Sequence, residues 1–183
     1  MNISFKRNLH TVITGDNGSG KSTLLGLMTG ILTPDKGSVE VFSNKFAYVG
    51  ATPLIIKGSL KENLMYGNSI DISDEEIIEL VKSYNLLTEE EPNLLEKQIS
   101  NKSLSSGQMQ KISFIRAMLS KPEILILDES TSNLDFDSRK LINQELKKSK
   151  ITIINSTHSI GEIEYDLRLH IDIKESTRTL RII

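Results

Sequence analysis

The chain of 183 residues contains no cysteine and no tryptophan, and aromatic residues make up only 5% of it. Without cysteine it has no disulfide and no thiolate metal site, which suits a reducing compartment. No apolar run approaches the roughly 18 residues that cross a bilayer, and the N-terminus lacks the apolar core of a secretory signal. We therefore expect any connection to a membrane to run through a partner.

The chain also lacks an excess of charge of either sign. It has 22 Lys and Arg against 24 Asp and Glu, a net charge of −2, and no basic block. Composition thus predicts no nucleic-acid partner and no anionic-membrane surface. With 38% hydrophobic residues and neither repeats nor low-complexity tracts, the length predicts one compact domain.

The most specific motif is a phosphate-binding pattern near the N-terminus, the run Gly15-Asp16-Asn17-Gly18-Ser19-Gly20-Lys21-Ser22. Its glycines allow the backbone to approach an anion, and successive N–H groups then form a phosphate-sized nest. Lys21 is predicted to reach the β- and γ-phosphates, and the Ser22 hydroxyl to ligate Mg²⁺. A chance glycine-rich turn is the alternative. A predicted strand at 11–14 and a predicted helix at 21–32 favour the phosphate loop.

A second motif closes an unbroken apolar run. Asp128 and Glu129 directly follow Ile124 to Leu127, a predicted buried strand. An acidic pair that caps a helix is the alternative, but a carboxylate after a buried strand is costly unless a cation or donors compensate it. Together with the phosphate loop, the pair predicts a nucleotide triphosphatase.

The remaining pattern predicts an α/β fold. Further strands are predicted at 2–5, 38–42, 46–49, 151–154, 167–174 and 178–183, with helices beginning at Ser59 and Ser73 and spanning 105–120 and 138–148. The run Glu89-Glu90-Glu91-Pro92 predicts a loop. The alternation implies a mostly parallel sheet with right-handed crossovers, flanked by helices. Ligands bind at the carboxyl ends of such strands, where Gly15, Asp128, Glu129 and His158 are all predicted to lie.

Five segments in this order resemble the nucleotide-binding domain of ATP-binding cassette (ABC) transporters: Gly15 to Ser22, Leu104 to Gln108, Ile124 to Glu129, Ser132 to Asp135, and His158. The stretch Gly58 to Leu64 looks more like exporter-type cassettes than importer ATPases. The resemblance implies one P-loop ATPase domain over 1–183. A small helical subdomain at about 59–120 carries the signature motif, and the N-terminal adenine-binding strands are absent.

The resemblance also implies a role for each matching residue. ATP would be held by Gly15, Asn17, Gly18, Ser19, Gly20, Lys21, Ser22 and Thr23, and Mg²⁺ by Ser22 and Asp128. Glu129 would polarise the attacking water, with His158 and Lys21 as the other catalytic residues. The signature residues Ser105, Ser106, Gly107 and Gln108 would cap the ATP of a second copy, and Asp135 would communicate between the two sites of that dimer.

The chain departs from the family pattern in several places. Ala51 stands where the family has a metal-reaching glutamine, so coordination would fall to water or Thr52. Ser106 replaces a glycine, which would weaken the cap on the opposite ATP if the position needs an open backbone. The adenine-stacking aromatic would lie ahead of this chain, because Phe5 is better interpreted as core. The Gly-Glu element of exporters is not recognisable in 96–103.

The leading hypothesis is an ATPase that powers transport from the cytoplasmic face of a membrane, with a second ATPase copy and transmembrane subunits as partners. A nucleotide-dependent binding or regulatory module with little hydrolysis is the alternative. Relatives in DNA repair or chromosome organisation carry long coiled-coil insertions, which this chain lacks. His10 and His170 have no supporting neighbours in sequence and are interpreted as surface or strand positions, and Phe136 as a packing residue.

Overall fold

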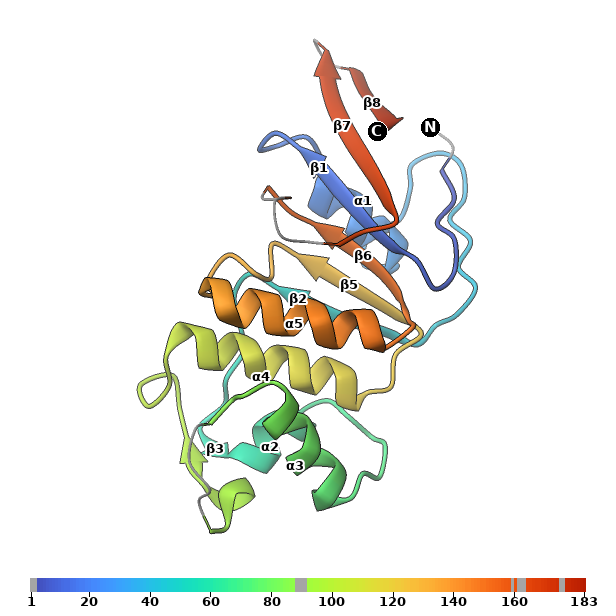
Figure 1. Ribbon diagram of the computed structural model, residues 1–183. Coiled ribbons are helices and arrows are strands. Elements are labelled where there is room, and N and C mark those ends of the chain that lie inside the picture. Colours follow the sequence, from blue (N-terminus) through green and yellow to red (C-terminus); the bar gives the residue numbers. More distant parts are fainter. Residues whose placement is uncertain (1–2, 88–91, 159, 161–163, 175–176) are drawn as a thin grey trace. The chain divides into compact units, whose positions relative to one another are not determined.

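The computed structural model describes residues 3–87, 92–158, 160, 164–174 and 177–183, and contains both helices and strands along the chain (Figure 1). The chain divides into two compact units. We call the first the strand unit, which comprises Met1–Tyr48, Glu123–Glu129 and Lys150–Ile183, and the second the helical unit, which comprises Val49–Pro122 and Ser130–Ser149. The predicted phosphate loop and the pair Asp128–Glu129 belong to the strand unit.

A six-stranded sheet has the order β2-β5-β6-β1-β7-β8. Its strands are β1 (His10–Gly15), β2 (Phe46–Gly50), β5 (Ile124–Asp128), β6 (Thr152–Ser156), β7 (Leu167–Lys174) and β8 (Thr177–Ile182). β5 pairs with β6, β6 with β1, and β1 with β7 in parallel, whereas β7 and β8 form an antiparallel hairpin. The predicted α/β fold with a mostly parallel sheet is confirmed.

The core of the strand unit lies between this sheet and helix α1 (Lys21–Met28). Leu25 of α1 packs with Ile13, Ile126, Ile154 and Leu169, one residue from each of the central strands. Burying such a side chain contributes about 1.5–3 kcal/mol, so this cluster fixes α1 on the sheet and with it the loop that precedes the helix. Phe5 packs against the same cluster, as predicted.

The helical unit holds α2 (Leu60–Met65), α3 (Asp74–Ser83), α4 (Ser106–Leu119) and α5 (Phe136–Lys148), the short strands β3 (Gly58–Ser59) and β4 (Gln98–Ile99), and a 3-10 turn at Leu94–Glu96. Ser59 and Glu62 form the predicted capping box at α2. Ser73 caps α3 by accepting from the N–H of Glu76. The Glu76 carboxylate binds Lys121 at 2.9 Å, so the predicted second capping box is only half formed.

Several predicted elements differ from the structure. Ile3 to Phe5 and 38–42 form no strand. Val39 and Val41 are 43% and 48% exposed, so their alternating pattern is not used in a sheet. Helix α1 ends at Met28 instead of residue 32, because Gly30 adopts a left-handed φ of +74°. Helix α5 begins two residues earlier than predicted, because the side chain of Asp135 caps it.

Two further predictions concern surfaces. Phe136 is 58% exposed, so its interpretation as a packing residue was wrong for this chain by itself. The acidic loop predicted at 89–92 lies mostly outside the described residues. In the part of the chain that the structure describes, no helix is both long and apolar enough to cross a membrane.

His10 predicts a pH dependence of stability. Burial lowers its pKa from 6.5 to about 4, against the opposing effects of Asp166 and the backbone of Glu164. The unfolded chain therefore takes up this proton first as pH falls, and the free energy of unfolding should decrease between about pH 6.5 and 4, by at most about 1.4 kcal/mol per pH unit. Denaturant titrations of the wild type and His10→Gln across this range would measure the difference. Equal slopes in the two proteins would contradict the prediction.

Candidate functional site

The sheet register gathers the predicted site residues of the strand unit at one edge. β5, β6 and β1 are neighbours and run parallel, and Asp128 pairs with Ser156 at the carboxyl ends of β5 and β6. β1 ends at Gly15, where the phosphate loop (Gly15–Ser22) begins. Glu129 follows the end of β5, and His158 comes two residues after the end of β6. The predicted clustering at the carboxyl ends of the strands is confirmed.

The phosphate loop has the backbone that its glycines predict. Gly15, Gly18 and Gly20 have φ of +151°, +77° and +100°. A Cβ on Gly15 would lie 2.7 Å from both the Ile171 carbonyl oxygen and Ser19 Oγ, so no side chain fits there. Nζ of Lys21 donates to the carbonyl oxygens of Gly15 and Asp16 at 2.9 and 3.2 Å. The lysine is only 5% exposed, so its charge is held at the loop itself.

The polar atoms around this loop suit an anion and a cation together. Ser22 and Thr23 are exposed in the first turn of α1, where free N–H groups and the helix dipole favour a phosphate. Ser19 Oγ and Asp128 Oδ1 are buried without a hydrogen-bond partner among the described residues. A buried carboxylate oxygen of this kind needs a donor or a cation. The described residues contain no cluster of three or more His, Cys, Asp or Glu.

Glu129 and His158 form a close polar contact at this edge. Nε2 of His158 lies 2.7 Å from Oε1 of Glu129, and both side chains are about two-fifths exposed. With Glu129 ionised, Nε2 carries the proton that they share. Glu129 has a φ of +52°, and its N–H donates to the carbonyl of Ser156. A left-handed backbone costs about 1–2 kcal/mol outside glycine, and such strain is concentrated at functional sites.

Tyr48 is a residue that the sequence did not identify. It lies on β2 between the buried Ala47 and Val49, so its side chain points to the other face of the strand. Its hydroxyl donates to Oδ2 of Asp128 at 3.2 Å. Burial and the neighbouring Asp128 carboxylate raise the pKa of Tyr48, which keeps this donor protonated. Only the alternation along β2 could have indicated that Tyr48 faces a different side from its neighbours.

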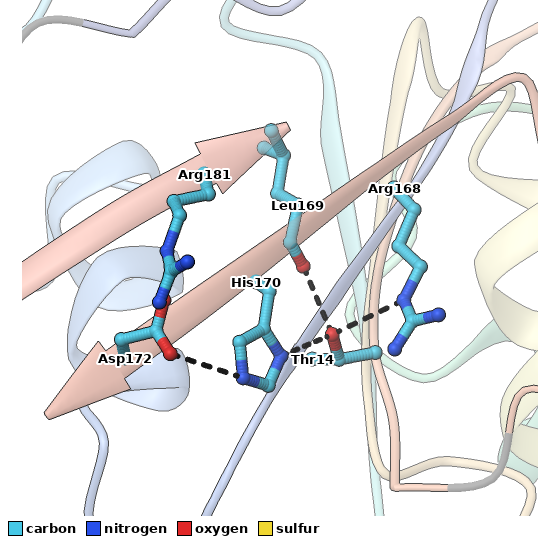
Figure 2. A network of polar contacts seen from close by, with 6 residues as sticks. All are labelled: Thr14, Arg168, Leu169, His170, Asp172 and Arg181. Atoms are coloured by element: carbon cyan, nitrogen blue, oxygen red, sulfur yellow. Dashed lines mark hydrogen bonds and ion pairs between the residues drawn. The ribbon is translucent and has the colours of Figure 1, made fainter. Parts of the chain in front are cut away.

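A polar network ties β7 to the residue just before the phosphate loop (Figure 2). The Thr14 hydroxyl donates to the Leu169 carbonyl at 3.1 Å and lies 2.9 Å from Nδ1 of His170. Because that hydroxyl has one proton, Nδ1 must donate to its oxygen. Nε2 of His170 faces Asp172 at 3.8 Å, and Arg181 of β8 donates to Asp172 at 2.5 Å. His170 thus lies on a strand, as predicted, but it has partners that the sequence did not show.

The signature residues are in the helical unit, at the start of α4. Oγ of Ser105 accepts from the N–H of Gln108 at 3.1 Å, and Oε1 of Gln108 accepts from the N–H of Ser105 at 2.9 Å. Ser106 and Gly107 form the first helical turn, and Ser106 has an ordinary right-handed backbone. This conformation does not require glycine at 106.

Two other predicted positions of the helical unit have defined partners. Oδ1 and Oδ2 of Asp135 accept from the N–H and the hydroxyl of Ser138 at 2.7 and 3.1 Å, and these bonds lower the pKa of Asp135. The carbonyl of Ala51 accepts from Nδ2 of Asn133 at 2.9 Å. The backbone at Ala51 is therefore held in place, although its side chain offers no ligand.

The chain is similar to several known proteins. A model of the ABC transporter family matches residues 1–132. The chain is 31% identical to the ATP-dependent permease MDL1 of Candida albicans, over 92% of this chain and 28% of that protein. It is 35% identical to the lactococcin transport/processing ATP-binding protein LcnC-like of Lactococcus lactis subsp. lactis, over 91% and 26%. It is 34% identical to ABC transporter B family member 17 of Arabidopsis thaliana, over 84% and 14%. The chain spans less than a third of the length of each of these relatives.

Proposed function

This chain belongs to the ABC transporter family as a nucleotide-binding domain, and from that premise we propose that it hydrolyses ATP to power export across a membrane. The exporter assignment draws on relatives that are named as a permease and as a lactococcin transport protein. The single observation that best supports hydrolysis is the 2.7 Å contact between Glu129 and His158 beside the phosphate loop. That contact provides a proton acceptor held in orientation next to the predicted γ-phosphate position.

The proposed reaction is phosphoryl transfer to water. The water oxygen bonds to the γ-phosphorus as the bond from that phosphorus to the ADP oxygen breaks, giving ADP and phosphate. Glu129 holds the water and accepts its proton, and His158 keeps the carboxylate in position through Nε2. Lys21 and the N–H groups of the phosphate loop neutralise the charge on the phosphates.

Hydrolysis by the wild-type chain is the experiment that tests this function. Phosphate release from Mg-ATP that depends on the chain is expected. Tight nucleotide binding with no phosphate release would favour the alternative of a binding or regulatory module, and no nucleotide binding at all would contradict both.

The metal site is proposed at Ser22 and Asp128. The buried Oδ1 of Asp128 has no hydrogen-bond partner among the residues described, and Ser22 is exposed at the start of α1. Mg²⁺, when bound, neutralises charge on the β- and γ-phosphate oxygens. Tyr48 occupies Oδ2 of the same carboxylate, which leaves Oδ1 as the oxygen available for a cation or its water.

Tyr48→Phe is therefore expected to weaken divalent-metal binding about 2- to 10-fold, because one hydrogen bond no longer orients the Asp128 carboxylate. Mn²⁺ binding in the presence of ADP, followed by electron paramagnetic resonance, measures this without relying on turnover. Tyr66→Phe is the matched control, because Tyr66 is also about half exposed and lies under Arg116 in the helical unit. Metal affinity that is unchanged or tighter in Tyr48→Phe would contradict the role of Tyr48.

We also propose that two copies form the working unit, with residues 59–120 as the subdomain that carries the signature. The first turn of α4 presents the N–H groups of Ser106 and Gly107, which the capping box does not use, beside the exposed Ser105 and Ser106, a setting suited to a phosphate from another chain. Asp135, which caps α5, would communicate between the two sites. Transmembrane segments of the transporter would place the pair at the cytoplasmic face of the membrane.

A further inference from the structure

The C-terminal hairpin of β7 and β8 reaches beyond the end of β1. Gly15, the last residue of β1, pairs with Ile171, and β7 continues to Lys174. The antiparallel return places Arg178 of β8 opposite Ile173. Arg178 therefore lies past the end of β1, at the level of the phosphate loop.

The guanidinium of Arg178 contacts this loop directly. Nε donates to the carbonyl oxygen of Ser19 at 3.1 Å, and Nη2 donates more weakly to that of Gly18 at 3.5 Å. A Cβ built on Gly20 would lie 3.5 Å from the same Nε, which places the arginine along three consecutive residues of the loop. Arg178 thus presents a full positive charge to the carbonyl side of the loop.

The contact with Arg178 also fixes the direction of an N–H group on the other side of the loop. In a planar trans peptide the C=O and the following N–H point in opposite directions. Since the Ser19 carbonyl faces Arg178, the N–H of Gly20 faces away from the hairpin. The N–H of Ser19 is already used inside the loop, where it donates to the carbonyl of Asp16 at 3.0 Å. Gly20 therefore offers the donor that the contact with Arg178 orients.

We propose that Arg178 is a positioning residue for the β-phosphate of a nucleoside di- or triphosphate, an inference that rests on the proposed function. Its hydrogen bond to Ser19 orients the Gly20 N–H and polarises that peptide unit, since linked hydrogen bonds strengthen one another. Its charge also raises the potential at the nest. Thr14 of β1 and His170 of β7 join the hairpin to β1 beside the phosphate loop (Figure 2).

The test compares nucleotide affinity in Arg178→Gln, Arg178→Lys and the wild type, using fluorescent analogues of ATP and ADP. Arg178→Gln is expected to weaken both about 3- to 30-fold, the effect of removing a unit charge several ångströms from the phosphates in a partly solvated site. The difference should shrink as salt is raised. Arg178→Lys keeps the charge but loses the planar guanidinium with its several N–H donors. Its nucleotide affinity should therefore lie between those of the wild type and Arg178→Gln.

Arg181→Gln is the matched control. It removes an arginine from the same strand and breaks the ion pair with Asp172 that ties the two strands together, but it does not touch the loop. Its nucleotide affinity should equal that of the wild type, with thermal melting confirming that each variant is folded. Equal affinity in Arg178→Gln and the wild type, or an equal loss in Arg181→Gln, would overturn the inference. If Arg178→Gln does not fold, the inference is tested by the nucleotide affinity of Arg178→Lys, which should be lower than that of the wild type. Failure of the wild type to bind any nucleotide would instead overturn the proposed function.

Discussion

Glu129→Gln is expected to lower ATP turnover by about 10²–10⁴-fold while leaving ATP affinity within a few-fold of the wild type. Glutamine has the same shape and still accepts from His158 through its amide oxygen, but it cannot take a proton from water. It also preserves the N–H bond to Ser156 that supports the left-handed backbone of residue 129. Phosphate release and an ATP titration measure the two quantities separately.

The same variant tests the proposed pairing of two copies. Without hydrolysis, Mg-ATP should accumulate at the site, and the solution mass should double when it is added. Glu123→Gln is a matched control, because Glu123 precedes the same strand but its side chain is half exposed and forms an ion pair with Lys45. Its turnover should match that of the wild type. Unchanged hydrolysis in Glu129→Gln would exclude Glu129 as the proton acceptor, and a monomer at saturating Mg-ATP would contradict the proposed dimer of isolated chains.

Lys21→Ala is expected to weaken ATP binding roughly 10- to 100-fold, the value of one charge-assisted hydrogen bond to a phosphate. Lys21 already lies at the loop, bonded to the carbonyls of Gly15 and Asp16, so little of its side-chain entropy remains to be lost on binding. Calorimetric titration with ATP measures the change, and Lys21→Met separates the lost charge from the lost side-chain volume.

Lys36→Ala is the control for this prediction, because Lys36 is exposed and lies outside the phosphate loop. Its affinity should not change. An ATP affinity of Lys21→Ala equal to that of the wild type would mean that this loop does not hold the phosphates.

The sequence predicted best those features whose signals are local. The phosphate loop, the strand before Asp128 and the Ser105 cap of α4 each depend on residues within a few positions of one another, and the structure contains all three. The prediction of a strand at 38–42 was wrong for a physical reason. An alternating pattern shows that a segment can pair, but a strand also needs a neighbour, and Val39 and Val41 are exposed.

Tyr48 and Arg178 could not be identified from the sequence, because their contacts depend on how distant strands align. Tyr48 meets Asp128 across 80 positions, and Arg178 meets Ser19 across 159. A shift of one residue in β2 or β8 would turn either side chain to the opposite face. The roles of Asp135 and of Ser105 to Gln108 stay predictions, since they concern a second copy of the chain. The subdomain at 59–120 also stays a prediction.

The position of β1 within the sheet has a consequence for biosynthesis. Its two neighbours are β6 and β7, which come much later in the sequence, so β1 leaves the ribosome well before either of them. Pairing across such a separation requires the closure of a very long loop, which slows folding. The predicted phosphate loop should therefore form only after β6 has been made, and nascent chains that stop before β6 should not retain ATP on the ribosome.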